Sequence, residues 1–309
     1  MICPECRREH RRKEGMRCGC GYEFCLDPKS DYLTDGKARR AAERASGEGA
    51  RFYTRNQWVA SLTNTSGNLR KFALVVCFVL AAAAAAAYRS DWGGWMLLAG
   101  VSAFALLVGL FGTPLPTPKH ARAAVEKYAC AKGPPPRQLK DTRPLDRPPP
   151  EALEEDLFDY GVTGVLVCQR PVLVDLFVFN GFAGERGLLV MAEDGYPDHL
   201  RPRLEQVLSE QPGVPVYALH NADAAGEAMA GRLERSGTFL GRPVTDLGLS
   251  REQAKRTKRL RRFAAADGSV AIDHLGYDRL SAALSEAIED GKLLTDALKS
   301  ETGTVISFG

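Results

Sequence analysis

The chain has 309 residues, which is enough for two ordinary domains. Its charged fraction of 26% is typical of globular protein, and a net charge of +3 is too small to indicate nucleic-acid binding by itself. Five of the eight cysteines fall within the first 25 residues, without an apolar signal segment. We therefore expect metal ligands in a reducing compartment rather than a secreted disulfide scaffold.

Residues 1–25 contain two closely spaced cysteine pairs, one CxxC and one CxC. Four thiolates bind zinc as a closed tetrahedral set, and the metal supplies folding energy that so short a segment lacks. The second pair, with the CxCGYxF pattern, resembles the second knuckle of a zinc ribbon. The predicted ligands of this structural zinc are Cys3, Cys6, Cys18 and Cys20. The alternatives for the fourth ligand are Cys25 and His10.

A long stretch that is nearly free of charge follows a polar segment at residues 26–70, in which we expect a helix over 35–44. Residues 72–88 and 93–112 carry no charge, and helices of these lengths would reach roughly 25 and 30 Å. Tryptophans in the connection suit a membrane interface. This pattern predicts a transmembrane hairpin, and a buried helical hairpin is the alternative.

Positive residues flank both apolar stretches, which sets the expected orientation. They are Arg70, Lys71, Lys119, His120, Arg122 and Lys127. By the positive-inside rule both termini would then lie in the cytoplasm, with the protein in the cytoplasmic (inner) membrane. A proline-rich linker at 113–150, with a short helix over 119–132, would separate the membrane from the next domain.

From residue 151 the pattern is that of an α/β domain. Apolar strands are expected at 164–168, 187–192 and 214–219, alternating with helices at 171–182, 198–210 and 223–235. Further helices are expected near 250–265 and 277–299. Alternation of this kind predicts right-handed crossovers and a mostly parallel sheet, with a ligand site at the carboxyl ends of the strands.

The strand ends read VLVCQR, EDGYPD and ALHNADAAG. Segment 164–226 resembles the Toprim domain of the topoisomerase VI A subunit family, most specifically in the GYPD run at 195–198. The resemblance implies a glutamate after the first strand and a DxD after the third, which bind magnesium. Here these positions hold Gln169, Asn221 and Asp223. Two neutral amides in place of carboxylates make magnesium binding doubtful and imply a degenerate active site.

The family's other catalytic element is absent as well. Its nucleophilic tyrosine lies on a winged-helix domain before the Toprim domain, where this chain has a proline-rich linker. Tyr53 matches no such motif, and we expect it to be a packing residue. Glu193 and Asp194 end the second strand and could, together with Asp223, form a rebuilt acidic metal site. The alternative for these acids is that they are solvated in loops.

A basic stretch follows the α/β segment, with seven positive residues among twelve. They are Arg251, Lys255, Arg256, Lys258, Arg259, Arg261 and Arg262. Such a stretch suits contact with nucleic-acid phosphates or with anionic lipid, or it is simply a solvated helix. Partners are therefore expected to be a membrane, and either nucleic acid or another protein.

The predicted divisions are a zinc ribbon at 1–25, a soluble juxtamembrane segment at 26–70, a transmembrane hairpin at 71–112, a proline-rich linker at 113–150, a Toprim-like domain at 151–249 and a helical extension at 250–309. The expected function is that of a membrane-anchored, catalytically inactive Toprim-like module that binds nucleic acid or a partner. One alternative is a divalent-metal-dependent nuclease with the rebuilt acidic site. The other is a zinc-ribbon membrane scaffold that binds protein only.

Overall fold

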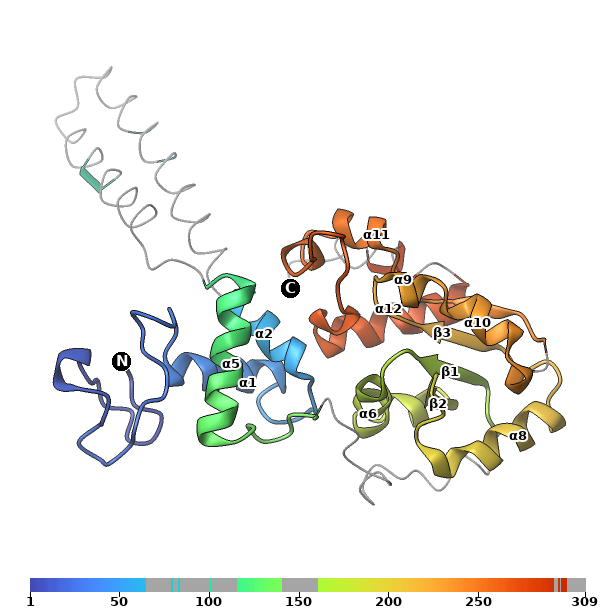
Figure 1. Ribbon diagram of the computed structural model, residues 1–309, viewed down its shortest axis with the longest axis horizontal. Coiled ribbons are helices and arrows are strands. Elements are labelled where there is room, and N and C mark those ends of the chain that lie inside the picture. Colours follow the sequence, from blue (N-terminus) through green and yellow to red (C-terminus); the bar gives the residue numbers. More distant parts are fainter. Residues whose placement is uncertain are drawn as a thin grey trace. The chain divides into compact units, whose positions relative to one another are not determined.

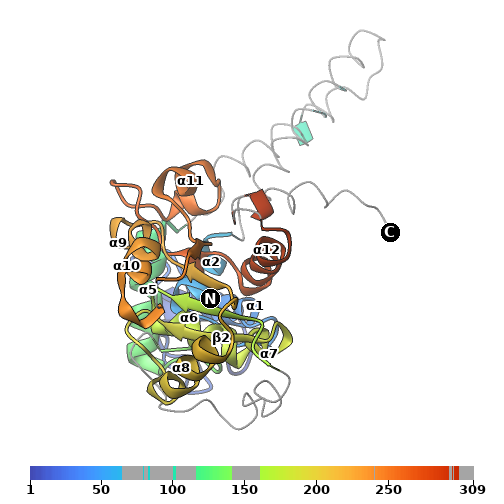
Figure 2. The same cartoon turned by 90° about the vertical axis from the view of Figure 1, so that its right-hand side faces the viewer.

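The computed structural model describes residues 1–64, 79, 83, 100–101, 116–140, 161–239, 241–291, 294 and 296–298 (Figures 1 and 2). The chain divides into two compact units. The first comprises Met1–Arg39 and Ser61–Lys132, and the second comprises Arg40–Ala60 and Gly133–Gly309. The second unit therefore begins with a short stretch from the N-terminal part of the sequence, well ahead of the α/β segment.

The described N-terminal part begins with the 3-10 helix η1, Arg12–Glu14, and the helices α1, Asp35–Ala45, and α2, Arg55–Asn64. Helix α5, Pro118–Lys132, comes later in the first unit. Helix α1 agrees with the helix expected over 35–44, whereas α2 was not expected. At the start of α1, the buried carboxylate of Asp35 accepts hydrogen bonds from Tyr22 Oη at 2.8 Å and from the Leu26 amide at 2.8 Å. This carboxylate ties the cysteine-rich segment to the first helix.

The fold class predicted above included two transmembrane helices, and that part of the prediction is wrong. In the described part of the chain no helix is both long and apolar enough to cross a membrane. The longest described helix, α5, has 15 residues, and at about 1.5 Å per residue it falls short of a bilayer core of about 30 Å. The predicted location in the cytoplasmic membrane, with both termini cytoplasmic, relied on the same hairpin and is wrong with it.

Most of residues 71–112, on which the hairpin prediction relied, lie outside the described residues. Four residues of this range are described, and each is helical and exposed. They are Val79, Ala83, Gly100 and Val101.

The second unit contains a four-stranded parallel sheet with the order β2-β1-β3-β4. The strands are β1, Gly164–Cys168; β2, Leu188–Ala192; β3, Val216–Leu219; and β4, Val244–Asp246. Strand β1 pairs with both β2 and β3, so that Cys168 lies between Ala192 and Leu219 at the carboxyl ends of the three strands. The predicted α/β fold with a mostly parallel sheet is therefore confirmed.

The strand order dictates which face each helix covers. The crossover from β1 to β2 runs in one direction along the sheet, and the crossovers from β2 to β3 and from β3 to β4 run in the other. Since such crossovers are right-handed, the first helices must lie on one face and the later ones on the opposite face. The first crossover contains α6, Pro171–Phe179, and α7, Phe182–Glu185. The later crossovers contain α8, Arg201–Glu210; α9, Ala224–Glu227; and α10, Met229–Arg235.

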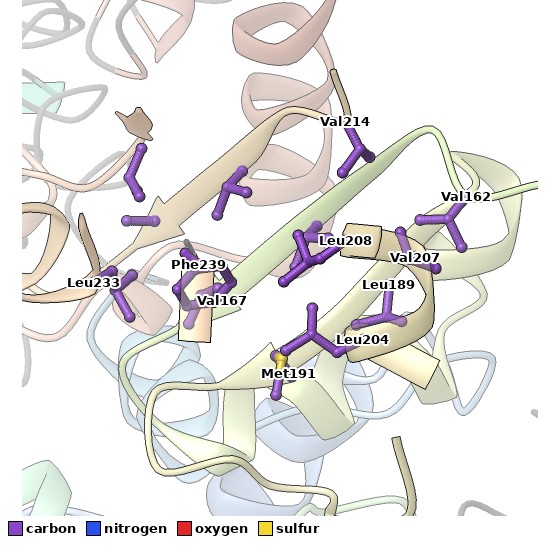
Figure 3. Close-up of a cluster of buried hydrophobic side chains, with 14 of the residues drawn as sticks. Val162, Val167, Leu189, Met191, Leu204, Val207, Leu208, Val214, Leu233 and Phe239 are labelled. Carbon is purple, nitrogen blue, oxygen red and sulfur yellow. The ribbon is translucent and has the colours of Figure 1, made fainter. Parts of the chain in front are cut away.

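A buried apolar cluster fills the space between the sheet and helices α8 and α10. It joins alternate residues of the strands, such as Val167 and Met191, to Leu204 on α8 and Leu233 on α10. Figure 3 shows Val167, Leu233 and Phe239 together at the carboxyl end of this cluster, and Val162 and Val214 at its other end. Burial of these side chains is the main stabilising contribution on this face.

The expected helices are shorter in the structure than the sequence pattern suggests. Asn180 ends α6, because its side-chain amide donates to the Leu176 carbonyl at 2.8 Å and to the Phe52 carbonyl at 3.0 Å. In the region after residue 240 the structure has α11, Arg251–Arg256, and α12, Tyr277–Asp290, with short 3-10 turns between them. Strand β4 was not expected, because it has only three residues, and two of them are exposed.

Polar contacts hold the N-terminal stretch of the second unit in place. Tyr53 exchanges backbone hydrogen bonds with Arg137 at 3.1 Å and with Leu139 at 2.8 Å. The side chain of Asn56 donates to Asp273 Oδ1 at 2.9 Å. Residues 137–139 of the expected linker therefore pair with the chain, and Tyr53 is fully buried, as expected for a packing residue.

A buried carboxylate on α6 makes the stability of the second unit depend on pH. Asp175 is 4% exposed, and its one hydrogen-bond donor in the described chain is Tyr196 Oη, at 2.7 Å from Oδ1. Burial raises the pKa of Asp175 to about 6, despite the opposing hydrogen bond. Because the folded state then binds a proton more tightly than the unfolded state, this group's contribution to stability falls as pH rises from about 4 to about 6.

We predict that Asp175→Asn removes this pH dependence. Relative to the parent chain, the variant should gain about 2 kcal/mol of unfolding free energy between pH 4 and pH 6, because the pKa of Asp175 lies at about 6 in the folded chain. Urea unfolding followed by circular dichroism at several pH values measures the difference. The exposed Asp198→Asn is the matched control. A constant difference between Asp175→Asn and the parent chain across this range would contradict the prediction.

Candidate functional site

Two tight turns build the cysteine cluster of the first unit. In the first, the Cys3 amide bonds to the Arg8 carbonyl at 3.0 Å, and in the second the Cys18 amide bonds to the Tyr22 carbonyl at 2.7 Å. The second turn passes through Gly21 with φ +93°, a conformation that side chains disfavour. The two turns therefore place the two cysteine pairs so that their thiols face each other.

The four cysteine sulfurs all lie within 4.8 Å of one another. Cys3 Sγ is 3.6 Å from Cys20 Sγ, and Cys6 Sγ is 3.7 Å from Cys18 Sγ. Tetrahedral zinc with bonds of about 2.3 Å requires sulfur–sulfur edges of about 3.8 Å, so the spacing fits such an ion. The cluster could hold a metal ion, and in the described part of the chain it is the one group of His, Cys, Asp and Glu side chains that could.

The environment of the thiols supports a bound cation. A backbone hydrogen bond at Cys20 lowers the pKa of Cys18, but burial and the neighbouring thiols raise it to about 11. Four thiolates so close together repel one another unless a cation lies between them. A metal ion bound between the four sulfurs would therefore offset the repulsion that their close packing causes.

The two alternative ligands make other contacts. His10 stacks on Phe24 with a centroid distance of 5.4 Å, and its Nε2 lies 2.9 Å from the Gly15 carbonyl. The Cys25 thiol lies 3.4 Å from Asp35 Oδ2, and burial followed by the charge of Asp35 raises its pKa to about 12. Neither side chain belongs to the cluster of four sulfurs.

The three residues that the sequence comparison with Toprim domains singled out, Gln169, Asn221 and Asp223, meet at the carboxyl ends of β1 and β3. Gln169 Nε2 donates to Asp223 at 3.1 Å, while Gln169 Oε1 accepts from the Asn221 amide at 2.7 Å. Asp223 Oδ1 also accepts from the Gly226 amide at 2.7 Å as the N-cap of α9. The side chain of Asn221 accepts from the Ile272 amide at 3.0 Å. Gln169 thus bonds to both of the other residues, and we call this set of three the strand-end triad.

The carboxylates of the hypothetical rebuilt site have different partners. Glu193 forms a two-pronged ion pair with Arg232, at 2.8 Å from Nε and 2.9 Å from Nη2. Asp194 Oδ1 accepts from the Tyr196 amide at 3.2 Å. Among the described residues these acids and Asp223 do not form a group close enough to share a metal ion.

A buried histidine beside the triad has no counterpart in the sequence-based prediction. His220 Nδ1 lies 2.7 Å from the Asn221 carbonyl, and Nε2 lies 2.9 Å from Asp246 Oδ1. A carbonyl and a carboxylate both accept, and this arrangement favours the ring with protons on both nitrogens. Burial lowers the pKa of His220, but the bonds to Asp246 and Asn221 outweigh it and raise the pKa. The place of His220 directly after the third strand could have marked it as a site residue. Its partner Asp246 could not be predicted, because it lies on β4, which was not expected.

The basic stretch divides into two short turns rather than one long helix. Ser250 caps α11 by accepting from the Gln253 amide at 3.2 Å, and Thr257 leaves the helix in an extended conformation. Buried Ala254 and Leu260 anchor the two turns. The exposed residues of the stretch are Lys255, Arg256, Lys258, Arg259, Arg261 and Arg262. Arg251 is half-buried and pairs with Glu227 at 2.9 Å.

Comparison of the chain with protein-family models, with curated proteins and with solved structures finds no match. The α/β fold and the four-cysteine cluster therefore stand on the geometry of this chain alone.

We predict that the purified full chain carries one metal ion and that Cys6→Ser abolishes its binding, since three thiolates no longer close the tetrahedron. Cys25→Ser is the matched control and should retain the ion, because its thiol contacts Asp35 instead. Metal content by mass spectrometry of the purified protein measures both. Loss of metal from the control variant, or its retention in Cys6→Ser, would show that the ligand set is different.

Proposed function

We propose that this chain is a zinc-stabilised, catalytically inactive nucleic-acid-binding protein whose α/β domain is a degenerate Toprim-like module. The observation that carries the proposal is the charge of residues 251–262, which contain seven positive side chains and one negative one, Glu252. Six of the positive side chains are exposed. An exposed excess of this size is the electrostatic signature of phosphate binding.

The form of this basic surface favours backbone contacts over base readout. Arg261 and Arg262 project from a short turn anchored by buried Leu260, and guanidinium groups suit phosphate oxygens. The aromatic residues that flank the stretch, Phe263 and Tyr277, are buried at 9% exposure, so they do not offer rings for stacking on bases. We therefore expect binding that is sensitive to salt and tolerant of sequence.

The strand-end triad supports the absence of catalysis. Magnesium prefers carboxylate oxygens, and the triad offers one carboxylate, which already accepts bonds from Gln169 and from the amide of Gly226. A Toprim-like active site would need two more negative charges and the glutamate as general acid or base. The likeness of the three strand-end positions supports a Toprim-like origin for the domain.

Zinc is the metal that best suits the cysteine cluster. Four sulfur ligands at tetrahedral spacing form a closed set with no open position, which is typical of structural zinc. The apolar cluster around them is small, with Cys3, Cys18 and Phe24 as its buried members. The ion would therefore supply much of the folding free energy of this segment.

We predict that Arg261→Ala combined with Arg262→Ala weakens binding to duplex DNA and lowers the slope of log Kd against log salt by about 2, one unit for each lost phosphate contact. Fluorescence anisotropy with the full chain at several salt concentrations measures the slope. The matched control is Lys29→Ala combined with Lys37→Ala, which removes equal charge from exposed positions in the first unit. An unchanged slope in the arginine variant, or no binding by the parent chain, would favour a protein partner instead.

We further predict that the full chain does not cleave DNA with magnesium or manganese and that Gln169→Glu combined with Asn221→Asp raises its magnesium affinity. The two substitutions restore negative charge beside Asp223, where electrostatic attraction to the ion is strongest. Calorimetric titration with magnesium measures the change. Gln206→Glu combined with Gln211→Glu, on and just after α8, controls for added charge alone.

Two results would contradict this prediction. Metal-dependent cleavage by the unmodified chain, lost on Glu193→Ala or Asp194→Ala, would show that the acidic site was rebuilt and that the protein is a nuclease. A magnesium affinity that stays unchanged in the double variant would show that the triad lacks Toprim geometry.

A further inference from the structure

A cavity of about 410 Å³ opens at the carboxyl ends of β1 and β2, between α8 and α10. Its apolar floor is the end of the buried cluster in Figure 3 and consists of Val167, Met191, Leu204, Leu233 and Phe239. A cavity of this size, with an apolar floor and a few polar groups, suits a small molecule. It is lined by different side chains from those of the strand-end triad.

The polar lining of the cavity carries both signs of charge. Glu193 and Arg232 neutralise each other through their two-pronged ion pair. Arg201 and Glu205 also line the cavity, and both are exposed at its mouth. They are four residues apart on α8, a spacing at which opposite charges commonly pair, yet in the described part of the chain neither forms an ion pair. One positive and one negative group therefore remain for a ligand.

The position of Arg201 is set by the turn after β2. Its guanidinium lies against Gly195, where an added Cβ would come within 2.4 Å of Nη2. Gly195 also has φ +88°, which side chains disfavour. The one hydrogen bond that the guanidinium makes in the described structure is to the Asp194 carbonyl, at 3.3 Å. The glycine thus allows the guanidinium to rest across the turn with most of its donors unused.

We propose that this cavity binds a small zwitterion with an apolar side group, of the class of free apolar amino acids. Arg201 takes the carboxylate, which matches the planar fork of a guanidinium. Glu205 takes the ammonium group, and the apolar floor takes the side chain. This site goes beyond the proposed nucleic-acid binding and does not depend on it.

The test is calorimetric titration of the full chain with L-phenylalanine and L-leucine, and with glycine, 3-phenylpropionate and phenethylamine as comparison probes. We expect the two apolar amino acids to bind and glycine not to bind, because glycine leaves the floor uncovered. The two phenyl probes, which each lack one charged group, should bind at least about tenfold more weakly than phenylalanine. Equal affinity for all phenyl probes would overturn the zwitterion assignment.

Variants separate the two charged contacts. Arg201→Gln should weaken phenylalanine about tenfold and leave phenethylamine unchanged, whereas Glu205→Gln should weaken phenylalanine and leave 3-phenylpropionate unchanged. The exposed Arg235→Gln and Glu210→Gln lie outside the cavity lining and control for each lost charge. Thr238→Trp fills the mouth from an exposed lining residue and should abolish binding without altering the buried core. No binding by the parent chain, or full binding by Thr238→Trp, would overturn the proposal.

Discussion

The side-by-side placement of β1 and β3 is the constraint on which the strand-end triad depends. The strand order forces the chain to leave β1 toward one face of the sheet and to leave β3 toward the other. The loops that follow these two strands therefore diverge, and the side chains at the strand ends meet between them. Gln169 and Asp223, which are 54 residues apart in sequence, come within 3.1 Å for this reason.

Hydrogen bonds join the residues of the strand-end triad to one another. An amide can donate and accept at once, so Gln169 bonds to Asp223 with one end and to the Asn221 amide with the other. Carboxylates at the same positions could only accept, and they would repel one another without a cation. With amides at two of the three positions, the strand ends are held together by hydrogen bonds and need no ion. Beside it, His220 Nε2 lies 2.9 Å from Asp246 Oδ1.

The cysteine cluster differs from the strand-end triad, because hydrogen bonds alone do not stabilise four thiolates at this spacing. Its four sulfurs lie within 4.8 Å of one another, and the apolar support around them is small. Such an arrangement is favourable when a metal ion binds it and costly when none does. Buried Asp35, which accepts bonds from Tyr22 and Leu26, connects the cysteine-rich segment to α1. The cysteine-rich segment could therefore gain from a bound ion the stability that the α/β sheet gains from apolar burial.

The parts of the structure that the sequence predicted well are those with short-range causes. The first three strands are apolar runs bounded by turn residues, and the closely spaced cysteine pairs predict tight turns. Several helices are shorter than the sequence predicted, because apolar periodicity does not reveal that Asn180 or Thr257 ends a helix. Strand β4 gave no signal, since its two exposed residues show no apolar run.

Long-range polar contacts explain what remained hidden. Asn56 and Asp273 are 217 residues apart, and no pattern in either segment indicates that they bond. The hairpin prediction failed for a related reason, since lack of charge in a stretch describes only composition. Whether a helix can cross a bilayer depends on the length it attains, and no described helix attains it.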